Sequence, residues 1–212
     1  MSEVVVYSIP GSPFLGSVIL ALEERRAPYA LDPWQPSEMR TETHLARHPF
    51  GRMPAIEHDG FELYETQAIL RYIAEAFPGE PLVPEDIRRR ARMNQLIGIN
   101  DWYFFPRFTS IAVWERLMKP RLMGQPSDLE AIEKALPVGR TCVDEIAKLM
   151  GEGPYLTGEN LTLADLHLAP QIHYLALTPE GEELLGAHPA IGTWLSSMRE
   201  RPSMKRTMLF GV

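Results

Sequence analysis

Ser12 and Pro13 follow a β-rich run at the start of the chain and form its clearest candidate site. Serine is favoured as the N-cap of a helix and proline at its first position, so the pair predicts a helix start. Free N–H groups and the helix dipole make such a terminus an anion site. A hydroxyl can cap its helix with an acceptor site and still donate to an anion. Ser12 is therefore a candidate anion-binding residue, and a purely structural cap is the alternative.

A second candidate anion site lies at Glu65 and Thr66, where a predicted strand is followed by a helix. The N–H groups there and the Thr66 hydroxyl can hold a carboxylate, while the Glu65 carboxylate can bind an ammonium group. The pair suits a ligand that carries both charges, and a helix cap beside a surface acid is the alternative. Arg40 and Arg52 could each bind a carboxylate, although a lone arginine is more often a solvated surface charge.

Neither a metal site nor a cysteine nucleophile is expected. The single cysteine, Cys142, excludes an internal disulfide, a Cys-x-x-Cys pair and a multi-cysteine metal site. It lies in a helical-looking stretch, where a buried inert thiol is the usual outcome. His44 and His48 share a helical face at i and i+4, but no carboxylate of the His-Glu-x-x-His kind accompanies them.

An α/β unit is predicted to position Ser12 and the Glu65 turn. Apolar β-rich runs predict strands, the first of them buried on both faces, and Asp59-Gly60 predicts a two-residue hairpin turn. The predicted elements are strands at 3–8, 28–32, 55–58 and 61–64, and helices that begin at Ser12 and cover 37–48 and 66–77. The order is therefore βαβαββα, and the last two strands are antiparallel.

Every periodic stretch beyond a proline-rich segment at 78–84 is helical, so we place a domain boundary there. The predicted domains are an α/β unit at 1–80 and an all-helical unit at 86–212. Long helices are predicted at 85–118, where Pro106 should kink or interrupt the helix, and at 128–150. Thr162 and Asp165 form a capping box that specifies a further helix start.

The composition is that of an ordinary globular protein. The chain has 212 residues, 45% of them hydrophobic, and a formal net charge of -7. This charge opposes attachment to nucleic acid or to an anionic membrane, and no apolar run approaches the roughly 18 residues of a membrane span. The first residues lack the basic and apolar regions of a signal peptide. We therefore expect a cytoplasmic protein with no nucleic-acid or membrane partner.

Four short motifs follow one another in a specific order. They are Pro-Gly-Ser-Pro-Phe at 10–14, His-Leu-Ala-Arg-His-Pro-Phe-Gly-Arg-Met-Pro-Ala-Ile at 44–56, Tyr-Glu-Thr-Gln-Ala-Ile at 64–69 and Thr-Leu-Ala-Asp-Leu at 162–166. With the predicted domains, they resemble the cytosolic glutathione transferases over the whole chain. The serine-type branches (phi-, tau- and theta-like) are the most similar, and a bacterial type is expected. The resemblance implies a thioredoxin-like domain, an all-α domain and a homodimeric detoxification enzyme.

The resemblance gives Ser12 a specific role, which is to donate to the sulfur of bound glutathione, the co-substrate, and hold it as a thiolate. One hydrogen bond to a charged group contributes about 1.5–3 kcal/mol, so the thiol pKa would fall by roughly one to two units. Tyr7 is the competing donor, because other branches use a tyrosine at the end of the first strand. Redox branches place cysteine where Ser12 stands, so transfer of glutathione to a hydrophobic electrophile is favoured over disulfide reduction.

The resemblance also assigns residues that bind the glutathione backbone. Pro54 corresponds to a cis-proline that turns the N–H and C=O of Met53 toward the cysteinyl part of the ligand. A trans proline at a strand edge is the alternative from the residues alone. Glu65 and Thr66 suit the zwitterionic γ-glutamyl end.

The glycine carboxylate of glutathione would be bound by Arg40 and Arg52. The phi-like pattern carries a histidine where Met39 stands and an asparagine where His48 stands. These departures weaken the assignment at the glycine end of the ligand.

An electrophile pocket is expected over the thiolate. By resemblance, the residues that would line it are Pro10, Phe105, Phe108 and Phe210, and ordinary core packing is the alternative for each phenylalanine. Two other functions stay open. One is a non-catalytic glutathione- or ligand-binding module, and the other is a glutathione-dependent peroxidase, lyase or dehalogenase on the same fold.

Overall fold

The computed structural model describes residues 2–208, and the chain forms two compact units. One unit contains the residues up to Leu82 together with the helix that follows Glu200, and the other runs from Val83 to Arg199. The predicted division into 1–80 and 86–212 differs from this arrangement at the C-terminal end, where the last helix belongs to the first unit.

The first unit is built on a four-stranded sheet in the order β2-β1-β3-β4. Its strands are β1 (Val4–Ser8), β2 (Tyr29–Pro33), β3 (Ala55–His58) and β4 (Phe61–Tyr64). Strand β2 is parallel to β1, whereas β3 is antiparallel to both β1 and β4. Asp59 and Gly60 both have positive φ, as a type I′ turn requires, so the predicted hairpin is confirmed.

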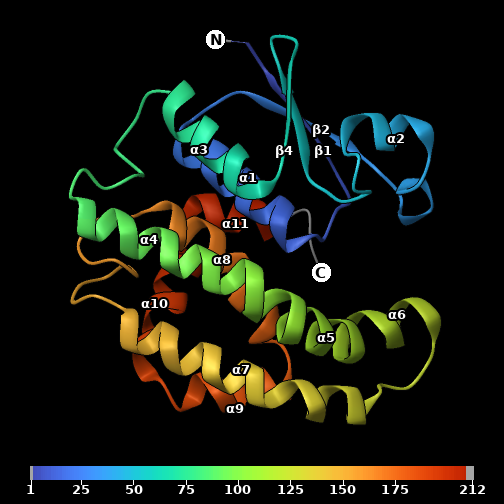
Figure 1. The fold of residues 1–212 in the computed structure, drawn as a ribbon, viewed down its shortest axis with the longest axis vertical. Coiled ribbons are helices and arrows are strands. Elements are labelled where there is room, and N and C mark those ends of the chain that lie inside the picture. Colours follow the sequence, from blue (N-terminus) through green and yellow to red (C-terminus); the bar gives the residue numbers. More distant parts are fainter. Residues whose placement is uncertain (1, 209–212) are drawn as a thin grey trace. The chain divides into compact units, whose positions relative to one another are not determined.

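Strand β1 is the centre of this unit and is covered on both faces, as its continuous apolar run predicts. Val4 and Val6 are fully buried, and Tyr7 packs in a separate cluster with Trp34 and Ala55. Helices α1 (Pro13–Glu24) and α3 (Thr66–Ala76) pack against each other (Figure 1). These elements place the start of α1 directly after the end of β1.

The predicted helix at 37–48 is two separate elements. A short 3-10 turn, η1 (Pro36–Glu38), precedes α2 (Glu42–Arg47). Thr41 has extended backbone, and its hydroxyl accepts a hydrogen bond from the N–H of His44 at 3.3 Å, so a new helix begins there. The prediction merged the two because both segments are short and polar.

The last helix, α11 (Pro202–Met208), packs against α1. Arg201 donates two hydrogen bonds to the Glu24 carboxylate, each at 2.8 Å, and the Ser203 hydroxyl donates a third. Burial alone would raise the pKa of Glu24, but these hydrogen bonds outweigh it and lower the pKa. This contact explains why α11 belongs with the first unit and not with the helical domain.

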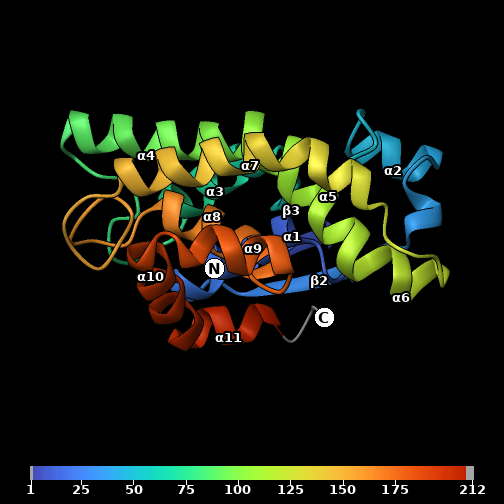
Figure 2. The same cartoon turned by 90° about the horizontal axis from the view of Figure 1, so that it is seen from below.

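The second unit is all-helical. Its main helices are α4 (Ile87–Ile99), α7 (Leu129–Leu149), α8 (Leu163–Leu175), α9 (Pro179–Gly186) and α10 (Pro189–Glu200). Shorter elements continue the path of α4, namely η2 (Asn100–Thr109), α5 (Ser110–Val113), η3 (Trp114–Met118) and α6 (Lys119–Met123). Figure 2 shows α4 and α7 side by side.

Pro106 lies inside η2, which has π-helical hydrogen bonding, so the helical path continues where the sequence predicted a kink or a break. Proline lacks the N–H that an α-helical hydrogen bond needs. A π-helix, with bonds that span one residue more, already departs from the α-helical ladder. The proline is therefore accommodated by a change of helix type.

The predicted capping box at the start of α8 is confirmed. The Asp165 carboxylate accepts hydrogen bonds from the N–H and the hydroxyl of Thr162 at 2.9 and 2.8 Å. It also accepts from the N–H of Leu156 at 2.8 Å and from the indole of Trp194 at 2.9 Å. Because Asp165 is fully buried, this one carboxylate joins the loop before α8 to α10.

Candidate functional site

Three strand ends meet at one edge of the sheet in the first unit. The register pairs Tyr7 in β1 with Ala55 in β3, and Ala55 with Tyr64 in β4. Because β3 is antiparallel to both neighbours, β1 ends, β3 begins and β4 ends at this edge. The predicted site residues that adjoin these three ends are Ser12, Pro54 and Glu65.

Ser12 is the N-cap of α1, as predicted. Its hydroxyl accepts a hydrogen bond from the N–H of Leu15 at 3.4 Å, and Pro13 occupies the first helical position. Gly11 has a φ of 87°, a left-handed conformation that favours glycine, and this turns the chain from β1 into the helix. The turn places a half-buried hydroxyl at the amino end of α1, and the cap uses only one of its acceptor sites.

The peptide bond between Met53 and Pro54 is cis, as the resemblance implies. Pro54 is buried and Met53 is half-buried. The Met53 thioether accepts a hydrogen bond from the N–H of Ile9 at 3.4 Å. This contact ties the start of β3 to the end of β1, on the edge that also carries Ser12.

Glu65 precedes α3 and has a φ of 70° and a ψ of 113°. A non-glycine residue in a sparsely populated region of this kind costs about 1–3 kcal/mol, and such residues cluster at ligand-binding sites. Within the described chain the Glu65 side chain makes no hydrogen bond to the first turn of α3. The free N–H groups of that turn and the adjacent Thr66 hydroxyl keep this position a candidate anion site.

Two domain models match the chain. Residues 6–81 match the model described as glutathione S-transferase, N-terminal domain, and residues 129–196 match the glutathione S-transferase, C-terminal domain. Glutathione S-transferase F7 of Arabidopsis thaliana is 31% identical over 98% of this chain and 100% of its own length. The chain belongs to the glutathione S-transferase family.

Solved glutathione transferase structures share the whole fold. Glutathione transferase F7 from Populus trichocarpa has a TM-score of 0.87 at 27% identity, over 98% of each chain. Glutathione S-transferase I from mais, in complex with an atrazine glutathione conjugate, has a TM-score of 0.83 at 25% identity, over 98% of this chain and 97% of that one. The predicted fold and enzyme class are confirmed. These relatives are plant proteins, so they give no support to the expected bacterial type.

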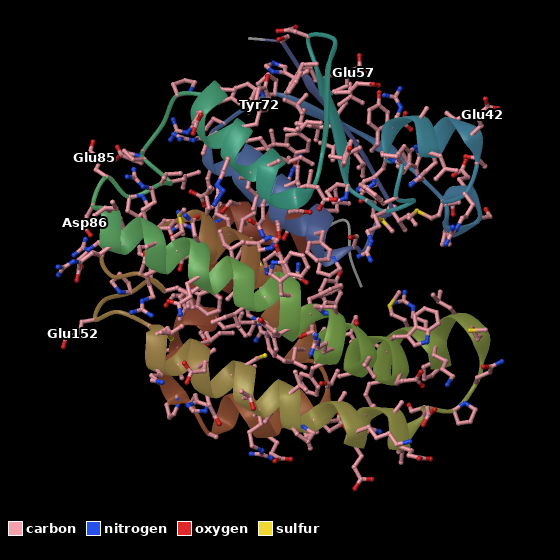
Figure 3. All side chains as sticks on the ribbon, in the orientation of Figure 1. Glu42, Glu57, Tyr72, Glu85, Asp86 and Glu152 are labelled. Atoms are coloured by element: carbon pink, nitrogen blue, oxygen red, sulfur yellow. The ribbon has the colours of Figure 1, made fainter. Side chains whose placement is uncertain are left out.

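Tyr7, the competing thiolate donor, is already engaged in this glutathione S-transferase. Its hydroxyl donates to the Glu57 carboxylate at 3.1 Å, and the Arg47 guanidinium lies 3.7 Å from the centre of its ring (Figure 3 labels Glu57). Burial raises the pKa of Tyr7, an effect that Arg47 opposes and Glu57 reinforces. The phenol therefore stays protonated near neutral pH with its hydrogen directed at Glu57, which favours Ser12 as the donor to a ligand.

We expect Tyr7→Phe to leave the pKa of a bound thiol unchanged and to lower the unfolding free energy by about 1 kcal/mol, the usual net value of one hydrogen bond. Tyr29→Phe is the matched control, because its hydroxyl donates to the Glu23 carboxylate at 2.7 Å. Ultraviolet titration of bound glutathione and urea unfolding measure the two quantities. A thiol pKa that rises in Tyr7→Phe and not in Tyr29→Phe would make Tyr7 the donor.

Sequence reasoning missed the roles of two buried histidines. His44 is 2% exposed, its Nε2 lies 2.9 Å from the carbonyl oxygen of Arg52, and its ring lies 4.1 Å from that of Trp34. His48 is equally buried and packs 4.8 Å from the ring of Tyr64, and burial lowers its pKa. Their spacing gave no sign of these contacts, because the partners come from other segments.

Arg40 and Arg52, which were predicted to bind the glycine carboxylate, are both exposed. Arg52 directly precedes Met53 and lies at the edge of the sheet that carries Ser12. Arg40 lies in the turn between η1 and α2. Arg52 therefore lies next to the candidate site because it adjoins Met53 in the chain. Arg40 has no such neighbour, and its position is set by the start of α2.

The predicted pocket residues have different environments. Pro10 is exposed after β1, and Phe105 is half-buried on η2. Phe108 is fully buried against α7, where a Cβ on Gly139 would come within 2.4 Å of its ring. Phe108 therefore packs in the core of the helical unit, which is the alternative that the sequence left open for it. Phe210 lies outside the described residues.

Cys142 on α7 is buried, and burial raises its pKa to about 11, so its thiol is unreactive near neutral pH. Among residues 2–208, no group of three or more His, Cys, Asp or Glu side chains is arranged to hold a metal ion. No helix in that part of the chain is long and apolar enough to cross a membrane.

Proposed function

We propose that this glutathione S-transferase uses Ser12 to hold the thiol of glutathione as a thiolate, which then attacks a hydrophobic electrophile. The observation that supports it most is the position of the Ser12 hydroxyl at the amino end of α1 with only one acceptor site used by the cap. The hydroxyl hydrogen is then available to the sulfur. The engagement of Tyr7 by Glu57 and the serine at the first helix both fit a serine-type branch of the family.

In this proposal three features lower the pKa of the thiol. They are the Ser12 hydroxyl, the free N–H groups at the start of α1 and the positive end of its dipole. The hydrogen bond from Ser12 alone lowers the thiol pKa by roughly one to two units, and the other two features add to this effect. The thiolate sulfur then forms a bond to the electrophilic carbon. In a substitution this carbon expels a leaving group with the bonding pair, whereas in a conjugate addition the π electron pair moves to the adjacent carbon, which then takes a proton. Holding both reactants in place lowers the barrier further.

The glutathione backbone is proposed to bind along the same edge of the sheet. The N–H and C=O of Met53, exposed to the ligand by the cis bond to Pro54, pair with the cysteinyl part. Glu65 and Thr66 bind the γ-glutamyl end, which carries both an ammonium and a carboxylate group. The exposed Arg40 and Arg52 are proposed to bind the glycine carboxylate, with Arg52 better placed because it adjoins Met53.

The remaining assignments are proposals from the family resemblance. Pro10 and Phe105 are proposed to contact the electrophile, and the domains at 1–80 and 86–212 to divide glutathione and electrophile binding. A homodimer in the cytoplasm is the proposed assembly and location, with no metal needed. The Arabidopsis and Populus relatives carry the name glutathione transferase, which supports conjugation over the peroxidase, lyase and dehalogenase alternatives.

The proposal is tested by ultraviolet titration of glutathione bound to the wild-type protein, together with conjugation of an activated aryl halide. We expect a bound thiol pKa at least roughly one to two units below that of free glutathione, and saturable conjugate formation. A failure to bind glutathione would overturn the proposal. Tight binding with no turnover of an electrophile panel would instead establish the non-catalytic binding module.

A further inference from the structure

The loop at 51–54, which leads into β3, is fixed at three points. The N–H of Gly51 donates to a carbonyl oxygen at the end of α2 at 2.8 Å. The carbonyl oxygen of Arg52 lies 2.9 Å from Nε2 of His44, and the Met53 thioether accepts from the end of β1 at 3.4 Å. His44 is the side chain from outside the loop that holds the peptide group just before the cis bond.

The chemistry of the two partners shows which of them donates the hydrogen bond between His44 and Arg52. Because a carbonyl oxygen can only accept, the imidazole carries its proton on Nε2 and donates to Arg52. Its Nδ1 is buried without a hydrogen-bond partner among residues 2–208, so the ring is oriented by the Nε2 bond and by Trp34. The backbone N–H of Trp34 donates to the carbonyl oxygen of Ser8 at 2.9 Å. A line of contacts therefore runs from the end of β1 through both rings to the loop.

The carbonyl of Arg52 and the N–H of Met53 belong to one planar peptide group. In a trans peptide these two groups point in opposite directions, so a carbonyl held inward by His44 turns the N–H of Met53 outward. A hydrogen bond to the carbonyl also polarises the group and makes its N–H a better donor.

We infer that His44 is a positioning residue for glutathione, which sets the direction of the Met53 N–H that pairs with the cysteinyl part. This inference rests on the proposed function, in which Met53 and Arg52 contact the ligand. His44 touches neither the sulfur nor the electrophile, so it acts on the binding of glutathione and not on the reactivity of its thiolate.

The test compares His44→Phe with His44→Gln. The phenyl ring keeps the packing on Trp34 and removes the donor, so we expect the Kd and KM for glutathione to rise about five- to tenfold. We expect kcat at saturating glutathione and the bound thiol pKa to stay at their wild-type values. The amide of His44→Gln can donate to the same carbonyl and should recover much of the affinity. Calorimetric binding, steady-state kinetics and ultraviolet titration measure these quantities.

His58→Phe is the matched control, because this histidine lies at the other end of β3 and bonds to the Tyr72 hydroxyl at 2.7 Å, so its KM should not change. An unchanged KM in His44→Phe, or a loss of kcat without a change in KM, would overturn the inference. So would a glutamine variant as weak as the phenylalanine variant. If His44→Phe does not fold, His44→Leu takes its place as the variant without a donor. A wild-type protein that binds no glutathione would overturn the proposed function instead.

Discussion

Replacing Ser12 with alanine is expected to raise the pKa of the bound glutathione thiol by roughly one to two units, with little loss of glutathione binding. The substitution removes a hydroxyl donor from a charged sulfur, and such a bond contributes about 1.5–3 kcal/mol. The helix terminus remains, so part of the thiol pKa depression should persist. Ultraviolet titration of the bound thiol measures the shift directly.

The same substitution should change the pH dependence of conjugation. A thiolate with a lower pKa is populated at lower pH, so the acid limb of the wild-type rate profile should move upward by roughly one to two pH units in Ser12→Ala. Near neutral pH the rate should fall about five- to tenfold, because the smaller ionised fraction is partly offset by the greater nucleophilicity of a more basic thiolate. Above the mutant pKa both thiols are fully ionised, so the deficit should disappear and the more basic thiolate of Ser12→Ala should react somewhat faster.

The effect of losing the helix cap on stability must be separated from the effect of losing the hydroxyl donor on the thiol pKa. Ser12→Ala removes the acceptor for the Leu15 N–H and should cost about 1 kcal/mol of unfolding free energy, whereas Ser12→Gly costs only a few tenths. Both variants should show the same thiol pKa. Ser17→Ala is the matched control, because this hydroxyl lies further along α1 and donates to the carbonyl of Pro13. A thiol pKa that stays at its wild-type value in both Ser12 variants would remove Ser12 from the proposed role.

Replacing Asp165 with alanine is expected to lower the unfolding free energy by about 3–5 kcal/mol. The buried carboxylate accepts hydrogen bonds from Leu156, Thr162 and Trp194. Each donor left unsatisfied in the interior costs about 1–3 kcal/mol, with partial relief as the structure relaxes. A typical domain is stable by only about 5–15 kcal/mol, so this loss is a large share of the total. Urea unfolding followed by tryptophan fluorescence, at fixed protein concentration, measures it.

Asp128→Ala is the matched control for this prediction. Asp128 is the exposed N-cap of α7, where its carboxylate accepts one hydrogen bond from the N–H of Ala131 at 3.0 Å. Its loss should cost about 1 kcal/mol, as for an ordinary cap. Equal losses in the two variants would show that Asp165 serves only as part of a helix cap and that its links to Leu156 and Trp194 add no stability.

Much of the site could be predicted where the deciding interactions are local. Ser12, Pro13 and Leu15 lie within one helical turn, so residue types alone indicate the cap. The cis bond at Pro54 came from the resemblance and not from physics, since proline alone allows either isomer. The strained turn at Glu65 had no signal in the residue type, because glutamate does not favour positive φ.

Other features could not be predicted because more than one structure suits the same local pattern. The dense aromatic run on η2 did not show which ring faces the core, and the structure buries Phe108 where Gly139 leaves room for it. Pro106 predicted a kink or an interruption without showing which, and the structure replaces the α-helix there by π-helical bonding. In both cases the outcome depends on packing against α7 and the rest of the helical unit.

The sequence by itself determined the elements that are specified by neighbouring residues. These are the start of α1, the Asp59-Gly60 hairpin and the capping box of α8. Their hydrogen bonds and dihedral angles involve residues a few positions apart, so each is encoded where it occurs. Only the tertiary structure decided that Tyr7 bonds to Glu57, 50 residues away, and that Glu24 bonds to Arg201, 177 residues away. It also directed His44 at the carbonyl of Arg52. Such residues come into contact only when separate elements pack together, and no spacing rule in the sequence predicts these contacts.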